Sequence, residues 1–177
     1  MYQKKRIHSQ METSTHIDII KNENNIKKLK TTKEINVQSQ IKEKVIQVSA
    51  SPYHTLVLVK SGKVYSMGDN SYGQLGLDDM NDRSTPCLID PKYFNGEKVV
   101  QVCSSSFRST VLTQNGNMYL WGENTFYQML DDQHIHYETP QLISLHFFKD
   151  EPIKHIFFGA RTCFVMTKQN HLYGWGN

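Results

Sequence analysis

The most constraining feature of the chain is a sequence unit that occurs three times at a constant spacing of 54 residues. It is clearest in residues 63–77, KVYSMGDNSYGQLGL. The shift of 54 relates Tyr65 to Tyr119 and Tyr173, Gly68 to Gly122 and Gly176, Asn70 to Asn124, Gln74 to Gln128, and Pro86 to Pro140. Self-similarity at a period near 50 residues is typical of propellers, solenoids and arrays, in which each unit stacks on its neighbours.

Each unit contains short stretches with the β-branched and aromatic composition of strands. In the first unit these are VIQVS, HTLVLV, KVYSMG and, after Pro86, CLI. The second and third stretches are joined at Ser61-Gly62, and at Asn115-Gly116 and Gln169-Asn170 in the other units. Two-residue hairpin turns with positive φ select Gly or Asn there. We therefore predict an all-β chain of antiparallel four-stranded units.

A glycine ends the third stretch of every unit, at Gly68, Gly122 and Gly176. Absence of a Cβ would let the backbone bend there, or approach another strand closely. A long loop follows each of the first two glycines, and a rigid β scaffold often carries its binding residues on such loops. We expect residues 69–84 and 123–138 to be these loops.

The stretch KVIQVSASPYHTLVLVKSGKVYSMGDNSYGQLG resembles a repeat of the regulator of chromosome condensation family, and the resemblance runs from about Lys44 to Asn177. His54 matches the family's usual histidine, residues 73–76 its GQLG loop, and Trp121-Gly122 and Trp175-Gly176 its Trp-Gly pair. Members fold as seven-bladed β-propellers with one repeat per blade. The resemblance implies a partial propeller, since 134 residues make about two and a half units of 54.

The second unit departs from the first. Tyr127, Met129 and Leu130 stand where the first unit has Gly73, Leu75 and Gly76, and Arg108 replaces His54. Because Tyr and Leu resist positive φ, the second loop should differ in shape. His54 is expected to make a structural hydrogen bond to a neighbouring turn rather than to act as an acid or base.

The predicted domains are a tail, residues 1–43, and repeats at 44–97, 98–151 and 152–177, the last incomplete. The tail holds nine Lys or Arg against five Asp or Glu, whereas the rest holds eleven against twelve. It has no sustained hydrophobic period, which favours a disordered basic extension. The alignment of Ile35 with Ile89 and Ile143 predicts a short strand near residues 35–37.

An open arc of units leaves apolar surface on its first and last members. Three explanations remain open: the chain is a fragment of a full ring, another chain completes it, or it is stable as it stands.

Enzyme signatures are absent: no phosphate-binding or dinucleotide glycine loop, no G-x-S-x-G and no H-E-x-x-H. We predict no enzyme and no cofactor. Asp131, Asp132, His134 and His136 form the one cluster of residue types that bind metals. Two imidazoles plus a carboxylate can bind zinc, but no fourth ligand is evident, and we predict a polar loop without a metal. Trp121 and Trp175 are expected to be packing residues rather than light sensors, although a plant member of the family senses light through tryptophans.

Cys87, Cys103 and Cys163 have no CxxC pattern and occupy strand-like positions, which suggests small buried side chains and a reducing compartment. Apolar runs are far shorter than the roughly 20 residues of a membrane helix. We expect a cytoplasmic or nuclear protein. We expect no nucleic-acid contact other than a weak one through the tail, at residues 4–6 and 27–30.

The expected function is a non-enzymatic protein–protein interaction module that presents its loops to a partner. The alternative is a guanine-nucleotide exchange factor for a Ran-like small GTPase, associated with chromatin through the tail. The resemblance also implies substrate recruitment in ubiquitin ligases and scaffolding as possible roles. The sequence does not identify which loop residues bind the partner.

Overall fold

The computed structural model describes residues 37–124, 134–159 and 162–176, to which every structural statement below refers. They form three antiparallel sheets. The first contains β1 (Val45–Ala50), β2 (His54–Val59), β3 (Val64–Gly68) and β4 (Arg83–Leu88); the second β5 (Val99–Ser105), β6 (Arg108–Thr113), β7 (Met118–Glu123) and β8 (His136–Leu142); the third β9 (Ile153–Phe158), β10 (Thr162–Thr167) and β11 (Leu172–Gly176). Strands follow chain order within each sheet. The all-β prediction is confirmed.

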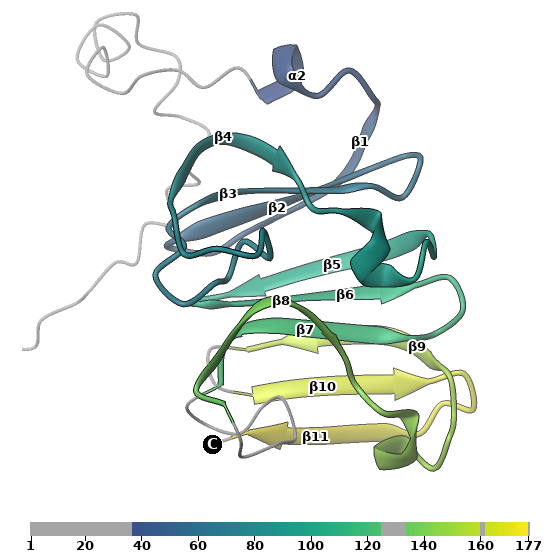
Figure 1. The fold of residues 1–177 in the computed structure, drawn as a ribbon. Helices are drawn as coiled ribbons and strands as arrows, with labels where there is room; N and C mark the ends of the chain where they lie inside the picture. The colour runs from purple at the N-terminus through teal and green to yellow at the C-terminus, as the bar shows by residue number, and fades with distance from the viewer. Residues whose placement is uncertain (1–36, 125–133, 160–161, 177) are drawn as a thin grey trace, which may run out of the picture. The chain divides into compact units, whose positions relative to one another are not determined.

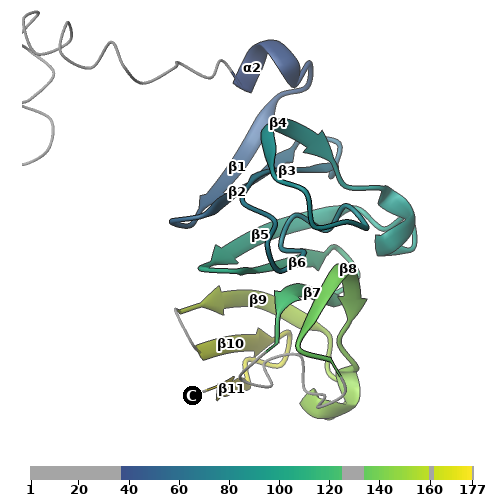
Figure 2. The same cartoon turned by 60° about the vertical axis from the view of Figure 1, so that its left-hand side comes forward.

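The three sheets lie side by side in chain order, as both views show (Figures 1 and 2). Between them runs one hydrophobic core that includes Leu56, Val102, Trp121, Ile156 and Val165. Each sheet therefore buries its apolar face against the next sheet, as in stacked repeat architectures.

The register repeats from sheet to sheet. Tyr65 faces Val57, Tyr119 faces Val111, and Tyr173 faces Val165. The three tyrosines thus occupy one structural position, which confirms that the 54-residue spacing reflects a structural unit.

The glycine positions behave as predicted. Gly62 and Gly116, in the hairpin turns, have φ of 92° and 91°, and Asn170 takes φ of 66° in the third turn. At Gly68 an added Cβ would collide with the carbonyl oxygen of Tyr53, and at Gly122 with that of Phe107. These glycines are required because another backbone segment passes too close for a side chain.

Two short 3₁₀ helices connect the sheets, η2 (Pro91–Phe94) and η3 (Leu145–Phe148), and neither was predicted. Each buries a phenylalanine edge-on to the repeated tyrosine: Phe94 lies 5.5 Å from Tyr119, and Phe148 lies 5.6 Å from Tyr173, between ring centroids. The connectors therefore belong to the hydrophobic core.

The segment before the first sheet corrects two predictions. Val37 begins a four-residue helix, α2 (Val37–Gln40), so it is not in a strand; Ile35 lies outside the described residues. Ile41 is fully buried against Val57 and Val59, so residues 37–43 are not a disordered tail. Val37 and Ile41 share one side of the helical turn, and this apolar pair gives the segment a surface to bury.

Apolar side chains are exposed at both ends of the row of sheets. Val48 is 56% exposed, whereas its equivalents Val102 and Ile156 are buried; Leu172 is 66% exposed, whereas Val64 and Met118 are buried. The expectation of uncovered apolar surface on the first and last units is confirmed.

Candidate functional site: the loop face

The ends of the strands form two opposite faces. We call one the loop face, made by residues 51–53, 69–83, 106–108, 123–124 and 134–138. The other, the hairpin face, is made by residues 42–44, 60–63, 90–98, 114–116, 144–154 and 168–170. In Figure 1 the hairpin turns and 3₁₀ helices of the hairpin face lie to the right, and the loop face lies to the left.

Asn70, which is fully buried, holds the first long loop together. Its Nδ2 donates to the carbonyl of Asp79 at 2.7 Å, and its Oδ1 accepts the N–H of Leu75 at 2.9 Å. Its own N–H donates to Oδ1 of Asp82 at 2.8 Å. Asn70 therefore ties three parts of the loop together through its side chain and its own N–H, which fixes the loop's shape.

The second sheet anchors this loop through the carbonyl of Gln74. That oxygen accepts the Oγ–H of Ser109 at 2.7 Å and the indole Nε1–H of Trp121 at 2.9 Å. Gly76 has φ of 71°, and a Cβ there would lie 2.7 Å from Nε1 of Trp121. Trp121 is fully buried, which confirms its packing role, and its indole N–H also holds the loop of the first sheet through the bond to Gln74.

His54 joins the first two sheets. Its Nε2 lies 2.7 Å from Oγ of Ser109 and its Nδ1 lies 3.0 Å from Oγ of Ser51. Because the Ser109 hydroxyl donates to the carbonyl of Gln74, its oxygen accepts a hydrogen bond from Nε2–H of His54, which leaves Nδ1 as the unprotonated nitrogen facing Ser51. Burial lowers the pKa of His54 to about 4. The imidazole is thus neutral with both nitrogens engaged, which confirms its predicted structural role.

Arg108 holds the equivalent position in the second sheet and is 3% exposed, 3.8 Å from Oε2 of Glu123. Asn124 matches Asn70 and donates from Nδ2 to the carbonyl of His134 at 2.9 Å. Residues 125–133 lie outside the described residues, so the prediction that the second loop differs in shape remains a prediction.

The histidines of the possible metal cluster have separate neighbours. His134 places Nδ1 3.0 Å from the hydroxyl of Tyr137, and His136 lies 3.8 Å from Glu138. Asp131 and Asp132 are outside the described residues. Within the described part of the chain, no three His, Cys, Asp or Glu side chains are placed to hold a metal.

Three aromatic rings cross the seam between the first two sheets on the loop face; we call them the aromatic patch. Tyr53 stacks on Phe107, with ring centroids 4.3 Å apart and an angle of 19° between planes. Tyr72 tilts against Phe107 at 4.9 Å. Tyr53 is 48% exposed and Tyr72 37%. Sequence reasoning missed the patch, although Tyr53 and Phe107 are 54 residues apart and the repeat could have revealed the pair.

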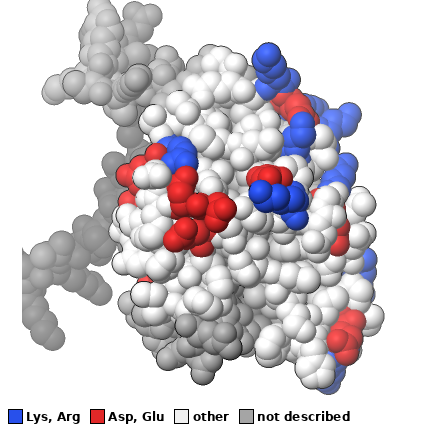
Figure 3. Space-filling model, in the orientation of Figure 1, with Lys and Arg blue, Asp and Glu red and all other residues white. Residues whose placement is uncertain are grey.

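The two faces differ in charge. All nine lysines of the described residues lie on the hairpin face, with five carboxylates: Glu43, Asp90, Glu97, Asp150 and Glu151. The loop face, over the same residues, carries Asp69, Asp78, Asp79, Asp82, Glu123 and Glu138 with two arginines, Arg83 and Arg108. Figure 3 shows red atoms gathered at the left and blue atoms along the right-hand side. The described loop face is therefore acidic and the hairpin face basic.

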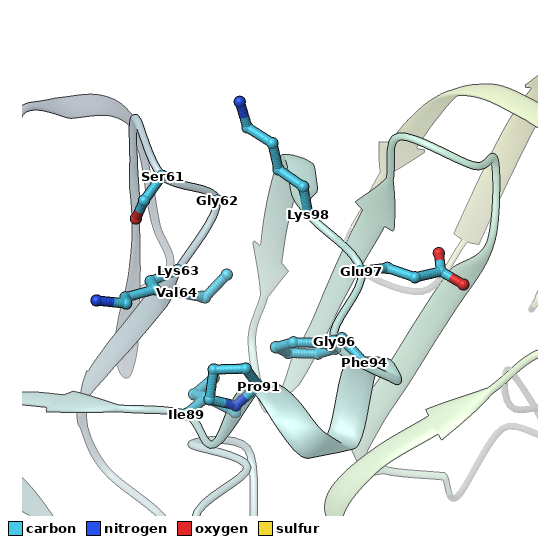
Figure 4. A pocket seen from close by; sticks show the side chains of 10 residues that line it. All are labelled: Ser61, Gly62, Lys63, Val64, Ile89, Pro91, Phe94, Gly96, Glu97 and Lys98. Atoms are coloured by element: carbon cyan, nitrogen blue, oxygen red, sulfur yellow. The ribbon is translucent and has the colours of Figure 1, made fainter.

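A small cavity of about 220 Å³ lies on the hairpin face between the first sheet and η2. Its wall is apolar around Val64, Ile89 and Phe94. In Figure 4 the charged ends of Lys63, Lys98 and Glu97 point away from the centre of the cavity. Ligand sites usually have 300–1,000 Å³ and polar groups that converge, so we do not assign this cavity a ligand.

Three antiparallel sheets of one repeated register, packed face to face in chain order, define part of a β-propeller. The chain carries repeats of the regulator of chromosome condensation (RCC1) family: models of this repeat match residues 45–74, 99–128 and 61–112. The resemblance noted in the sequence is confirmed.

Similar proteins include the mouse probable E3 ubiquitin-protein ligase HERC4, 34% identical over 143 residues, or 80% of this chain and 13% of HERC4. The dog X-linked retinitis pigmentosa GTPase regulator is 42% identical over 84 residues, 47% of this chain and 8% of its own length. Yeast RCC1 (Prp20) bound to Kap60 matches in structure with a TM-score of 0.64 and 28% identity, over 75% of this chain and 32% of that one. The chain thus spans only a minor part of each.

Proposed function

We propose that this chain is a non-enzymatic protein–protein interaction module whose loop face binds a partner protein. The observation that carries the proposal is the exposed aromatic patch, one ring of which, Tyr72, lies on a loop that both sheets hold in place. Tyrosine is enriched among the residues that dominate binding energy at interfaces. A loop already fixed by Asn70 and Gln74 loses little conformational entropy on binding.

Two features support a role without catalysis. The buried imidazole of His54 is neutral and has both nitrogens engaged within the protein. The charged groups beside the hairpin-face cavity diverge instead of converging on a reacting atom. HERC4 is named as a ubiquitin ligase, but the match covers 13% of it, and we do not carry ligase activity over to this chain.

Site-specific photo-crosslinking tests the proposal. A benzophenone amino acid replaces Met80, which is 43% exposed on the same loop. In extract of the cells that express the protein, we expect a discrete crosslinked band, which disappears when an excess of unlabelled protein is added. The matched control replaces Phe147, which is 50% exposed on the hairpin face, and should not give that band. Equal crosslinking from both positions would argue against a loop-face interface.

A second candidate is guanine-nucleotide exchange on a small GTPase, associated with chromatin. It draws support from the likeness to Prp20p of Saccharomyces cerevisiae, a protein that binds Gsp1p and histones, at 29% identity and a TM-score of 0.64. The purified chain would be added to a small GTPase loaded with labelled guanine nucleotide. Faster nucleotide release would favour exchange over an interaction-only module.

We also propose that the exposed ends, at Val48 and Leu172, pack against further blades of the same or another polypeptide, and that the protein acts in the cytoplasm or nucleus. No helix within the described stretches is both long and apolar enough to cross a membrane. Sedimentation velocity tests whether a second polypeptide covers the end at Val48, because Val48→Asp should then reduce the assembled fraction. An assembled fraction that is unchanged in Val48→Asp would contradict that arrangement.

A further inference from the structure

We propose that the aromatic patch binds an arginine-bearing basic segment of the partner protein. This inference rests on the proposed function of the loop face and names the chemistry of its partner.

The rings offer π surface to a cation. Phe107 contacts both tyrosines, and the exposed parts of Tyr53 and Tyr72 face solvent at the seam between the first two sheets. A guanidinium is planar, weakly hydrated and stacks on aromatic faces, so it matches such a surface better than an ammonium does.

Asp69 supplies a carboxylate in the loop that carries Tyr72. The N–H of Asp69 donates to the carbonyl of Tyr53 at 2.9 Å, which places the two residues side by side. Oδ1 of Asp69 accepts the N–H of Ser71 at 3.1 Å and a hydrogen bond from Nε2 of Gln74. Oδ2 accepts the Oγ–H of Ser71 at 2.9 Å, and a carboxylate oxygen can accept a second hydrogen bond. An arginine stacked on a tyrosine of the patch would thus find an anionic acceptor within the same loop.

The charge around the patch favours the same partner. The two arginines of the described loop face already have acidic neighbours, since Arg83 forms an ion pair with Asp79 and Arg108 is buried near Glu123. The described loop face still carries six carboxylates against these two arginines, and such an excess of negative charge attracts a cationic segment and speeds its association. It also repels phosphates, so a nucleic acid does not fit this surface.

Fluorescence anisotropy of the full 177-residue chain with labelled ten-residue peptides tests the inference. The peptides alternate serine with arginine, lysine or glutamate. We expect the arginine peptide to bind more tightly than the lysine peptide, and the glutamate peptide not to bind. Tyr72→Ala and Tyr53→Ala should each raise the Kd for the arginine peptide about three- to tenfold, as expected for loss of a cation–π contact. Phe147→Ala, which removes an equally exposed ring from the hairpin face, should leave the Kd unchanged.

Thermal unfolding of each variant shows whether it is folded, and Tyr72→Phe, which keeps the ring, should restore binding. Equal Kd values for the arginine and lysine peptides, unaffected by the tyrosine substitutions, would overturn the inference, as would binding of the glutamate peptide. If the arginine peptide fails to bind but Met80 still gives its specific crosslink, this inference fails and the proposed function stands. If the arginine peptide fails to bind and Met80 gives no specific crosslink, both this inference and the proposed function fail.

Discussion

The side-chain amide of Gln47 closes two hydrogen bonds on the backbone of Val102. Its Nε2 donates to the Val102 carbonyl at 2.8 Å, and its Oε1 accepts the Val102 N–H at 3.0 Å. Gln101 repeats the arrangement on Ile156, at 2.7 and 3.1 Å. β5 and β9 are edge strands, with a neighbouring strand on one side only. Each glutamine therefore bonds to backbone groups on the side of the strand that has no neighbouring strand. The joint between sheets is therefore polar at its edge as well as apolar in its core.

Replacing Gln47 by Leu should lower the free energy of unfolding by about 1–3 kcal/mol, because the backbone groups of Val102 lose their partners while the volume changes little. Urea denaturation measures the change. Gln141→Leu is the matched control, since Nε2 of Gln141 bonds only locally, to Thr139. Equal losses in the two variants would contradict a role for Gln47 in joining the sheets.

The protein should lose stability in mild acid because of His54. Its pKa is about 4 in the folded state and 6.5 for the unperturbed side chain. Between these values the unfolded chain binds a proton that the folded chain does not, so stability falls as pH drops from about 6.5 to about 4. The contribution is about 3 kcal/mol. His54→Gln should remove this part of the pH dependence, and His134→Gln should keep it. An unchanged slope in His54→Gln would disprove the assignment.

Two glycines with positive φ should respond differently to a methyl group. Gly96→Ala, at φ of 71° with open space around it, should cost about 1–2 kcal/mol from backbone strain alone. Gly122→Ala, at φ of 93°, adds a collision with the carbonyl of Phe107 and should cost at least about 1–3 kcal/mol more. Thermal unfolding of the two variants gives the difference. Similar melting temperatures would mean that the Phe107 backbone yields easily.

The thiols should differ in reactivity. Cys163 is fully buried, and burial raises the pKa of its thiol, whereas Cys87 is half-buried. With a disulfide reagent we expect Cys87 to react in the native protein and Cys163 only as the protein unfolds. Cys87→Ser should remove a fast phase from the kinetics. A native-state reaction of Cys163 at a comparable rate would contradict the packing of β10.

Much of the fold could be predicted because the repeat multiplies weak local signals. The turns at Gly62 and Gly116 and the column of Tyr65, Tyr119 and Tyr173 follow from residue type plus spacing. The helix at Val37 could not be predicted in that way. Its conformation depends on burying Ile41 against Val57, a tertiary contact outside the repeat.

In the candidate site, too, features that follow from the repeat were predicted, whereas features that depend on packing between sheets were not. A long loop after Gly68 was expected from the repeated glycine. The aromatic patch was missed because Tyr53, Tyr72 and Phe107 come from three separate turns, and only the packing of two sheets brings them together. The charge difference between the faces was hidden as well, since acidic loops and basic hairpins alternate along the sequence and nearly cancel in the total.

The glutamine joints have an evolutionary consequence. Gln47 and Gln101 each bind the backbone N–H and C=O of a single residue on the neighbouring strand, and every amino acid except proline supplies both of these groups. Val102 and Ile156 could be exchanged for other side chains of similar size without disturbing these bonds. Neighbouring repeats can therefore drift apart in sequence, and their loops can acquire new specificities, while the connection between them stays intact.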